Sequence, residues 1–282
     1  MLRAMVVMAL ACLLPGVAMA ETVVPLAVGD SQVRFAVADD FVRLSEKLPT
    51  VFAMEGAVQP KTNRLVEGFV SLADAKRIAL GEFHEQVLLE VVVMRNTEAL
   101  DFTEADWAKA RPQIATAMGQ VDLKAAINDS QASANQRMSD TMGQKVAVQF
   151  GQVGKPVFYG NDPASLRFVV LVSADVVSNG KTIPYQVENA GAVVRLGPKL
   201  VLVYANRRHT DGDDTSAVRS ALDAFVGRAI ALNNVGESTS AAGDREAGCK
   251  GRRVGDTDGA SASTRIDAPC NDIPADAKDH QQ

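Results

Sequence analysis

The sequence predicts an α+β domain built on a mostly antiparallel sheet and covered by two main helical segments. Two turn signals carry this prediction: Asn179-Gly180 lies between two β-rich runs, and Gly197-Pro198 lies between the second run and a third. Asn-Gly accepts the positive φ values that a tight hairpin turn requires. Residues 166–206 are therefore expected to form a three-strand antiparallel meander.

Shorter β-rich runs precede the meander. The run VLLEVVVM (87–94) is apolar on both faces, which is typical of a central strand covered on both sides. Residues 145–150 and 156–160 flank GQVGK and are expected to pair as a hairpin. Two further runs with strand composition are VRFAV (33–37) and RLVEGFV (64–70).

The first helix is expected to begin at Thr103, which can cap the free amides while acidic residues follow in the first turn. Pro112 is expected to kink or divide this helix, and a second piece is expected to run toward Ile127. The polar residues 128–143 that follow fit either a helix or a loop.

The second helix is expected to follow Asp214 or Thr215, one of which would be its cap. Residues Arg219, Asp223 and Gly227 are expected to face away from the sheet. One apolar stripe at helical spacing would cover the sheet, and it consists of Val218, Leu222, Phe225, Ala229 and Leu232.

Residues 1–20 have the pattern of a cleavable export signal, with Arg3, an apolar run over residues 5–14, and small residues at Ala18 and Ala20. The apolar run is shorter than the roughly 20 residues that a membrane span requires. Cleavage is expected after Ala20. The sequence therefore predicts a periplasmic or secreted protein with no transmembrane segment after cleavage.

The mature chain is expected to divide into a single domain, residues 21–234, and a flexible low-complexity tail, residues 235–282. The tail contains no Leu, Met or aromatic residue, so it cannot bury enough apolar area to offset its backbone entropy. Loss of the signal removes Cys12 and leaves Cys249 and Cys270. In an oxidising compartment a disulfide between these two is expected, within one chain or between chains.

Charge and motif patterns exclude several classes of function. The net charge is −5 and both signs are spread along the chain, so nucleic-acid binding is disfavoured. The string NGKT at 179–182 ends like a phosphate-binding loop, but Asp175 stands where its first glycine is required. No cofactor is predicted.

His209 precedes three aspartates, Asp211, Asp213 and Asp214, and these four side chains could supply a nitrogen and several oxygens to a metal ion. A calcium loop that starts at Asp211 would need Gly at its sixth position, which is Ser216. The simpler interpretation is that the acidic residues cap the helix that follows.

His84 and Glu90 are the other candidate catalytic residues. His84 lies between two glutamates and could act as a general base, but the motif H-E-x-x-H would place a second histidine where Leu88 stands. Glu90 interrupts an apolar strand and would cost several kcal/mol if it were buried, charged and unpaired. Arg167 is one candidate partner across the sheet; the alternatives are that both residues point to solvent or that Glu90 has a raised pKa in a cleft.

The order of elements, with patterns such as VRFAV, KLVLVYA and ALDAFVGRAIALNN, resembles uncharacterised exported bacterial proteins. In outline it is also similar to the PsbP-like α/β/α sandwich over residues 30–234. PsbP-like domains act as binding or assembly modules, so the resemblance implies a non-enzymatic role. It transfers no site residues.

The sequence therefore favours an exported binding or assembly module of the bacterial cell envelope, whose partner is an envelope protein or a small ligand. The alternative is a periplasmic hydrolase or metal-dependent enzyme that uses His84, Glu90, His209 and the nearby aspartates. That alternative requires these residues to converge in one cleft.

Overall fold

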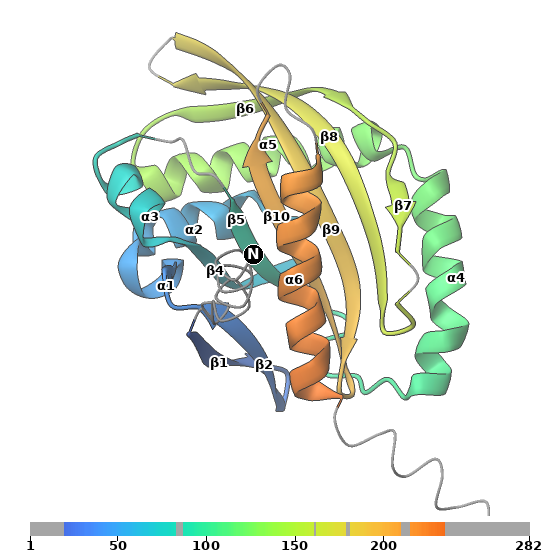
Figure 1. The fold of residues 1–282 in the computed structure, drawn as a ribbon. Coiled ribbons are helices and arrows are strands. Elements are labelled where there is room, and N and C mark those ends of the chain that lie inside the picture. Colours follow the sequence, from blue (N-terminus) through green and yellow to red (C-terminus); the bar gives the residue numbers. More distant parts are fainter. Residues whose placement is uncertain (1–19, 83–86, 161, 179–180, 210–214, 235–282) are drawn as a thin grey trace, which may run out of the picture. The chain divides into compact units, whose positions relative to one another are not determined.

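The computed structural model describes residues 20–82, 87–160, 162–178, 181–209 and 215–234 (Figure 1). It confirms a mixture of helices and antiparallel sheet. The strands are β1 (Glu21–Val28), β2 (Ser31–Ala38), β3 (Phe41–Arg43), β4 (Asn63–Ser71), β5 (Leu88–Met94), β6 (Val146–Val153), β7 (Val157–Tyr159), β8 (Ser165–Ser178), β9 (Lys181–Leu196) and β10 (Lys199–Arg208). The helices are α1 (Leu44–Lys47), α2 (Pro49–Val58), α3 (Leu72–Ala79), α4 (Glu104–Gln120), α5 (Leu123–Met142) and α6 (Ser216–Asn233).

Several sequence-based predictions concern residues outside those ranges. The export signal before Ala20 and the tail over 235–282 are among them, so both stay predictions. The same holds for these individual residues: His84, Asp211, Asp213, Asp214, Cys249 and Cys270.

The main sheet has eight strands in the order β3-β4-β5-β10-β9-β8-β6, and β7 also pairs with β8. The predicted meander is confirmed, because Ser178 pairs with Lys181 and Leu196 pairs with Lys199. The prediction for 87–94 is confirmed as well, since β5 lies between β4 and β10 and six of its seven residues are buried. The predicted hairpin of residues 145–150 and 156–160 is wrong, because β6 and β7 each pair with β8.

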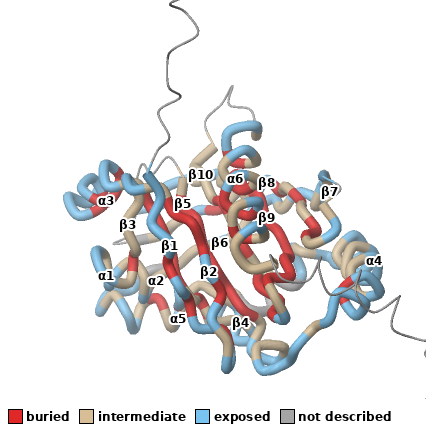
Figure 2. The backbone as a smooth tube through the Cα atoms, turned by 60° about the horizontal axis from the view of Figure 1, so that its bottom comes forward, coloured by how far each residue is buried: buried red, intermediate tan, exposed pale blue. Residues whose placement is uncertain are grey.

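One face of the sheet, here the α6 face, is covered by α6 and the β1–β2 hairpin (Figure 1). The ring of Phe225 stacks on Phe35 with 5.1 Å between centroids and meets Phe69 edge-on at 5.7 Å. Long buried stretches run through the central strands β5 and β9 (Figure 2). The predicted apolar stripe of α6 is confirmed except that Leu232 is only half-buried, while Val226 joins the stripe.

The opposite face, here the α4 face, carries α4 at one side, α1 to α3 at the other, and α5, which packs against α2 and β6. Trp107 of α4 is 1% exposed and packs on Leu166 and Val193 of the sheet. Its indole N–H donates a hydrogen bond of 2.7 Å to the Pro163 carbonyl. None of the described helices is both long and apolar enough to cross a membrane.

The start of α4 agrees with its sequence signal, but its end does not. Thr103 accepts a hydrogen bond from the Asp106 amide at 3.1 Å, and the Asp106 carboxylate accepts one in return, which is a capping box. The helix continues through Pro112 and ends at Gln120, and α5 then includes the polar segment 128–143 nearly to its end. Helices α2 and α3 were not predicted, since both are short.

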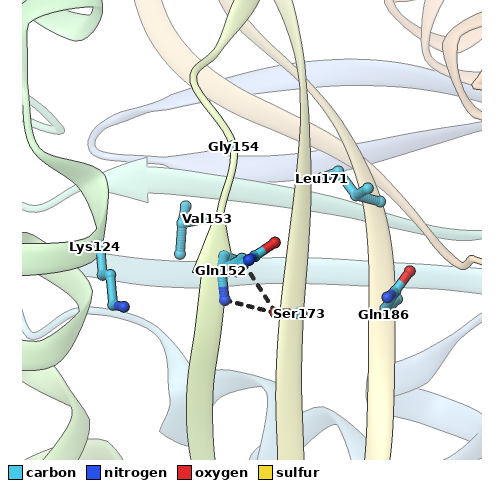
Figure 3. A pocket seen from close by; sticks show the side chains of 7 residues that line it. All are labelled: Lys124, Gln152, Val153, Gly154, Leu171, Ser173 and Gln186. Atoms are coloured by element: carbon cyan, nitrogen blue, oxygen red, sulfur yellow. Dashed lines mark hydrogen bonds between the residues drawn. The ribbon is translucent and has the colours of Figure 1, made fainter.

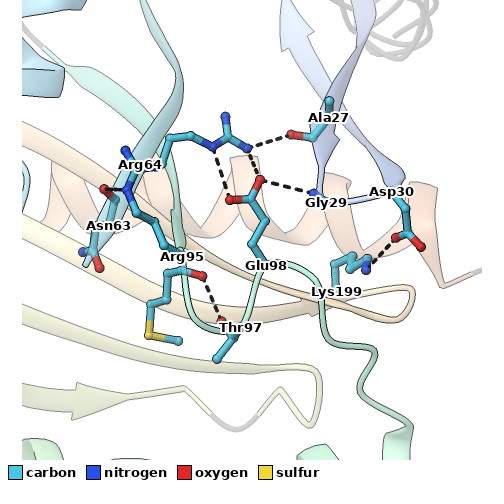
Figure 4. A network of polar contacts seen from close by, with 10 residues as sticks. Ala27, Gly29, Asp30, Asn63, Arg64, Arg95, Thr97, Glu98 and Lys199 are labelled. Atoms are coloured by element: carbon cyan, nitrogen blue, oxygen red, sulfur yellow. Dashed lines mark hydrogen bonds and ion pairs between the residues drawn. The ribbon is translucent and has the colours of Figure 1, made fainter. Parts of the chain in front are cut away.

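A network of charged groups fixes the turn of the β1–β2 hairpin to the main sheet (Figure 4). Glu98 pairs with Arg64 and also accepts a 3.3 Å hydrogen bond from the Gly29 amide. Lys199, which is buried, places its Nζ 2.8 Å from Asp30 Oδ1. Gly29 has φ +59°, and a Cβ there would lie 2.4 Å from the backbone oxygen of Glu98, so the turn requires glycine.

Candidate functional site

Strand register determines which polar residues share a face of the sheet. Directly paired residues on antiparallel strands point to the same face, and the face alternates along each strand. Tyr204 pairs with Glu90 on β5 and with Gly191 on β9. Because Val203 and Ala205, its neighbours on β10, contribute to the core under α6, Tyr204 and Glu90 point to the α4 face.

Four residues form a polar group on the α4 face, and we call Glu90, Asn189, Tyr204 and Asn206 the Glu90 cluster. The Asn206 side-chain amide donates a 2.7 Å hydrogen bond to Glu90 Oε2. Asn189 donates in turn to Asn206 Oδ1. Glu90 is 4% exposed, and its Oε1 has no hydrogen-bond partner among the residues that the structure describes.

Burial controls the protonation of the cluster. It raises the pKa of Glu90 to about 7, although the hydrogen bond from Asn206 works in the opposite direction. It also raises the pKa of Tyr204 to about 12, and the negative charge of Glu90 adds to this shift. The cluster therefore holds a carboxyl group that changes charge near neutral pH.

The α4 face is incompletely covered around the cluster. Val203 and Ala205 are buried under α6, whereas Tyr204 and Asn206 on the other face are only half-buried. Asn189 on β9 is half-buried as well. The three outer side chains of the cluster are therefore partly exposed, while the Glu90 carboxyl is buried.

An aromatic wall borders the cluster on β8. The Phe168 ring meets Tyr204 edge-on, with 6.5 Å between the ring centroids. A Cβ at Gly191 would lie 2.3 Å from Phe168 Cζ, so the missing side chain leaves the room that the ring occupies. Glycine at this position thus lets an aromatic ring approach the cluster.

The prediction that Arg167 pairs with Glu90 is wrong, because the two residues lie on opposite faces. Arg167 pairs in register with Ala192, which belongs to the core under α6. Its guanidinium lies 2.8 Å from Asp223 of α6 and 3.0 Å from Asp162. The expectation that Asp223 faces away from the sheet is corrected by the same contact.

His209 belongs to a second polar group, the Glu188 cluster, which consists of Glu188, Arg207 and His209 on the α6 face. Glu188 is fully buried, and its Oε2 accepts from Arg207 at 3.1 Å. Its Oε1 lies 2.7 Å from Nδ1 of His209, which fixes the orientation of the imidazole ring. This carboxylate therefore has two basic partners.

The structure does not bring the candidate catalytic residues together. Glu90 points to the α4 face, whereas His209 contacts Glu188 on the α6 face, so the sheet separates them. His84, Asp211, Asp213 and Asp214 lie outside the described residues. Within the described part of the chain no three His, Cys, Asp or Glu side chains are grouped as metal ligands.

A surface depression of about 380 Å³ lies at the edge of the sheet between Lys124 of α5 and strands β6, β8 and β9 (Figure 3). Ser173 lines this depression, and its hydroxyl accepts a 2.6 Å hydrogen bond from the backbone amide of Gln152. Ser173 pairs with Gln186, whose carbonyl accepts from the His209 amide, so β9 separates the serine from the histidine. Two strand spacings amount to about 10 Å, which is too far for an activated serine.

Sequence reasoning identified Glu90 but missed the rest of its cluster. Asparagine is depleted in strands, so Asn189 and Asn206 within the β-rich runs of the meander were a signal that could have been used.

Comparisons with protein-family models, with curated proteins and with solved structures found no match.

Proposed function

We propose that this chain is an exported, non-enzymatic binding module of the bacterial cell envelope, and that the Glu90 cluster is its site for a small ligand. The observation that carries the proposal is the buried Oε1 of Glu90, which has no partner among the described residues. The other members of the cluster are half-buried side chains, namely Tyr204, Asn206 and Asn189.

The cost of an unpartnered polar atom supports this interpretation. A buried acceptor without a hydrogen bond costs about 1–3 kcal/mol, and more when it is charged. Buried polar atoms in folded proteins nearly always have a partner, so each exception calls for an explanation. A ligand that contacts Glu90 would supply the missing partner, while Tyr204 and Phe168 would offer it an apolar and aromatic wall.

The separation of Glu90 from His209 favours binding over hydrolysis. A hydrolase that combines these two residues would need both at one reacting centre. The sheet lies between them, and β9 separates Ser173 from His209 on the α6 face. The Glu188 cluster orients the imidazole but holds no nucleophile in contact with it among the described residues.

Native mass spectrometry of the full chain, isolated from the producing bacterium without denaturation, tests the proposal. We expect part of the wild-type protein to retain the mass of a small molecule and the Asn206→Leu variant to lose it. Gln186→Leu, in the depression at the sheet edge, is the matched control and should retain it. Equal retention by wild type and Asn206→Leu, or no retained mass in any of the three, would contradict the proposal.

The enzymatic alternative has its own test. Purified protein is assayed with a panel of chromogenic esters, amides and phosphate esters. We expect no turnover above that of the Glu90→Gln and His209→Ala variants. Turnover that disappears in both variants would overturn the non-enzymatic role.

A further inference from the structure

We propose that the Glu90 cluster selects a ligand with a positively charged nitrogen, an ammonium or guanidinium group, which pairs with Glu90 Oε1. This inference rests on the proposed function and names the chemical class of the ligand.

The buried carboxylates of the described residues are Glu67, Asp74, Glu90 and Glu188. Glu67 pairs with Arg43 at 2.7 Å. Asp74 lies 3.9 Å from Arg77. Glu188 pairs with Arg207 and contacts His209.

Glu90 is the member of this set for which the described residues provide no cation. Its one hydrogen-bond donor is the neutral amide of Asn206. The closest basic residue along the same face of β10 is Arg208, whose guanidinium lies over the ring of Tyr185 at 5.5 Å from the centroid. A buried carboxylate is favourable only when it is paired, so the missing positive charge is the feature that a ligand can supply.

The surroundings of Glu90 fit a cation better than an anion. The amide chain is oriented, because Asn189 donates to Asn206 and Asn206 donates to Glu90. This order leaves the second carboxylate oxygen, the buried Oε1, as an acceptor. Tyr204 lies opposite Glu90 on the neighbouring strand, and the faces of aromatic rings attract ammonium and guanidinium groups. An anionic ligand would meet the charge of Glu90, for which the described part of the chain supplies no basic partner.

Three probes with the same alkyl chain separate charge from hydrophobic contact: butylammonium, 1-butanol and butyrate. Binding is followed by NMR at pH 8, through the side-chain amide resonances of Asn206, which contacts Glu90 directly. We expect butylammonium to give a saturable shift and to bind about tenfold or more tightly than either other probe, a difference of at least ~1.4 kcal/mol.

Two glutamate variants complete the experiment. Glu90→Gln keeps the size of the side chain and removes its charge, so it should weaken butylammonium about tenfold and leave 1-butanol unchanged. Glu67→Gln is the matched control, because this carboxylate is also buried but is paired with Arg43, and it should not alter any of the three affinities. The amide spectrum of each variant reports whether the fold is intact.

The outcomes separate this inference from the proposed function. Tighter binding of 1-butanol or butyrate at Asn206 would refute the cation and leave the ligand site standing. Absence of any saturable shift with butylammonium, or equal butylammonium affinity in wild type and Glu90→Gln, would also refute the cation. The ligand site itself is tested separately, by native mass spectrometry of wild type and Asn206→Leu, which uses none of these probes.

Discussion

Replacement of Glu90 by glutamine should change how the stability of the protein depends on pH. Burial raises the pKa of Glu90 from 4.5 to about 7 in the folded chain. The unfolded chain ionises Glu90 above pH 4.5, while the folded chain keeps the proton until about pH 7. Because the folded state binds more protons in this window, the contribution of Glu90 to stability is present below pH 4.5 and is lost as the pH rises through 7.

The size of the effect follows from the pKa difference. One pKa unit corresponds to about 1.4 kcal/mol, so a shift from 4.5 to about 7 corresponds to about 3 kcal/mol. Glutamine stays neutral at every pH. The stability of wild type relative to Glu90→Gln should therefore fall by about 3 kcal/mol between pH 4 and pH 8, and most of the change should occur between pH 4.5 and pH 7.

Urea unfolding of both proteins across this pH range measures the difference. Subtraction of the two curves removes the contribution of the other carboxylates, and pH 8 is still well below the pKa of Tyr204, about 12. Parallel curves would show that the Glu90 pKa is the same in the folded and unfolded chains. In that case the carboxyl is not desolvated, and the argument for an unpartnered buried acid fails.

Two further predictions concern packing. Gly191→Ala places a Cβ 2.3 Å from Phe168 Cζ and should destabilise the protein by about 1–3 kcal/mol in chemical denaturation. Gly227→Ala is its control: a Cβ there meets no atom within 4 Å, so alanine should stabilise the helix by about 0.5–1 kcal/mol. Phe225→Ala removes a ring that is 1% exposed and should lower the free energy of unfolding by about 3–5 kcal/mol. Leu80→Ala, at an 80% exposed position, should change the melting temperature by less than about 2 °C. Equal effects within either pair would contradict the packing described.

Local turn chemistry explains why the meander could be predicted from the sequence. The Asn179-Gly180 signal in the sequence predicts that its flanking residues pair, and Ser178 lies opposite Lys181; the Gly197-Pro198 turn likewise sets Leu196 opposite Lys199. Each turn fixes the register of the two strands that it joins, and every later pair follows from it. The capping box at Thr103 is equally local, and it too was predictable.

Pairs between segments far apart in the sequence have no comparable signal. The register of β10 on β5 places Tyr204 opposite Glu90, and the two residues are joined by a long stretch of chain rather than by a turn. Without this register the face of Glu90 is undetermined, which is why Arg167 was a plausible partner in the sequence and an incorrect one in the fold. The same reason explains the failure of the 145–150 and 156–160 hairpin, since both segments pair with β8.

The two polar clusters at this end of the sheet show how alternate residues of the same strands take different roles. On the α6 face Glu188 is satisfied within the chain by Arg207 and His209, so it needs nothing from outside to remain buried. On the α4 face Asn206, the neighbour of Arg207, orients Glu90 but brings no charge. The strands thus present one carboxylate that is neutralised internally and one that takes up either a proton or an external cation. Under this reasoning proton binding and ligand binding compete at Glu90, and a cationic ligand should release about one proton when it binds below pH 7.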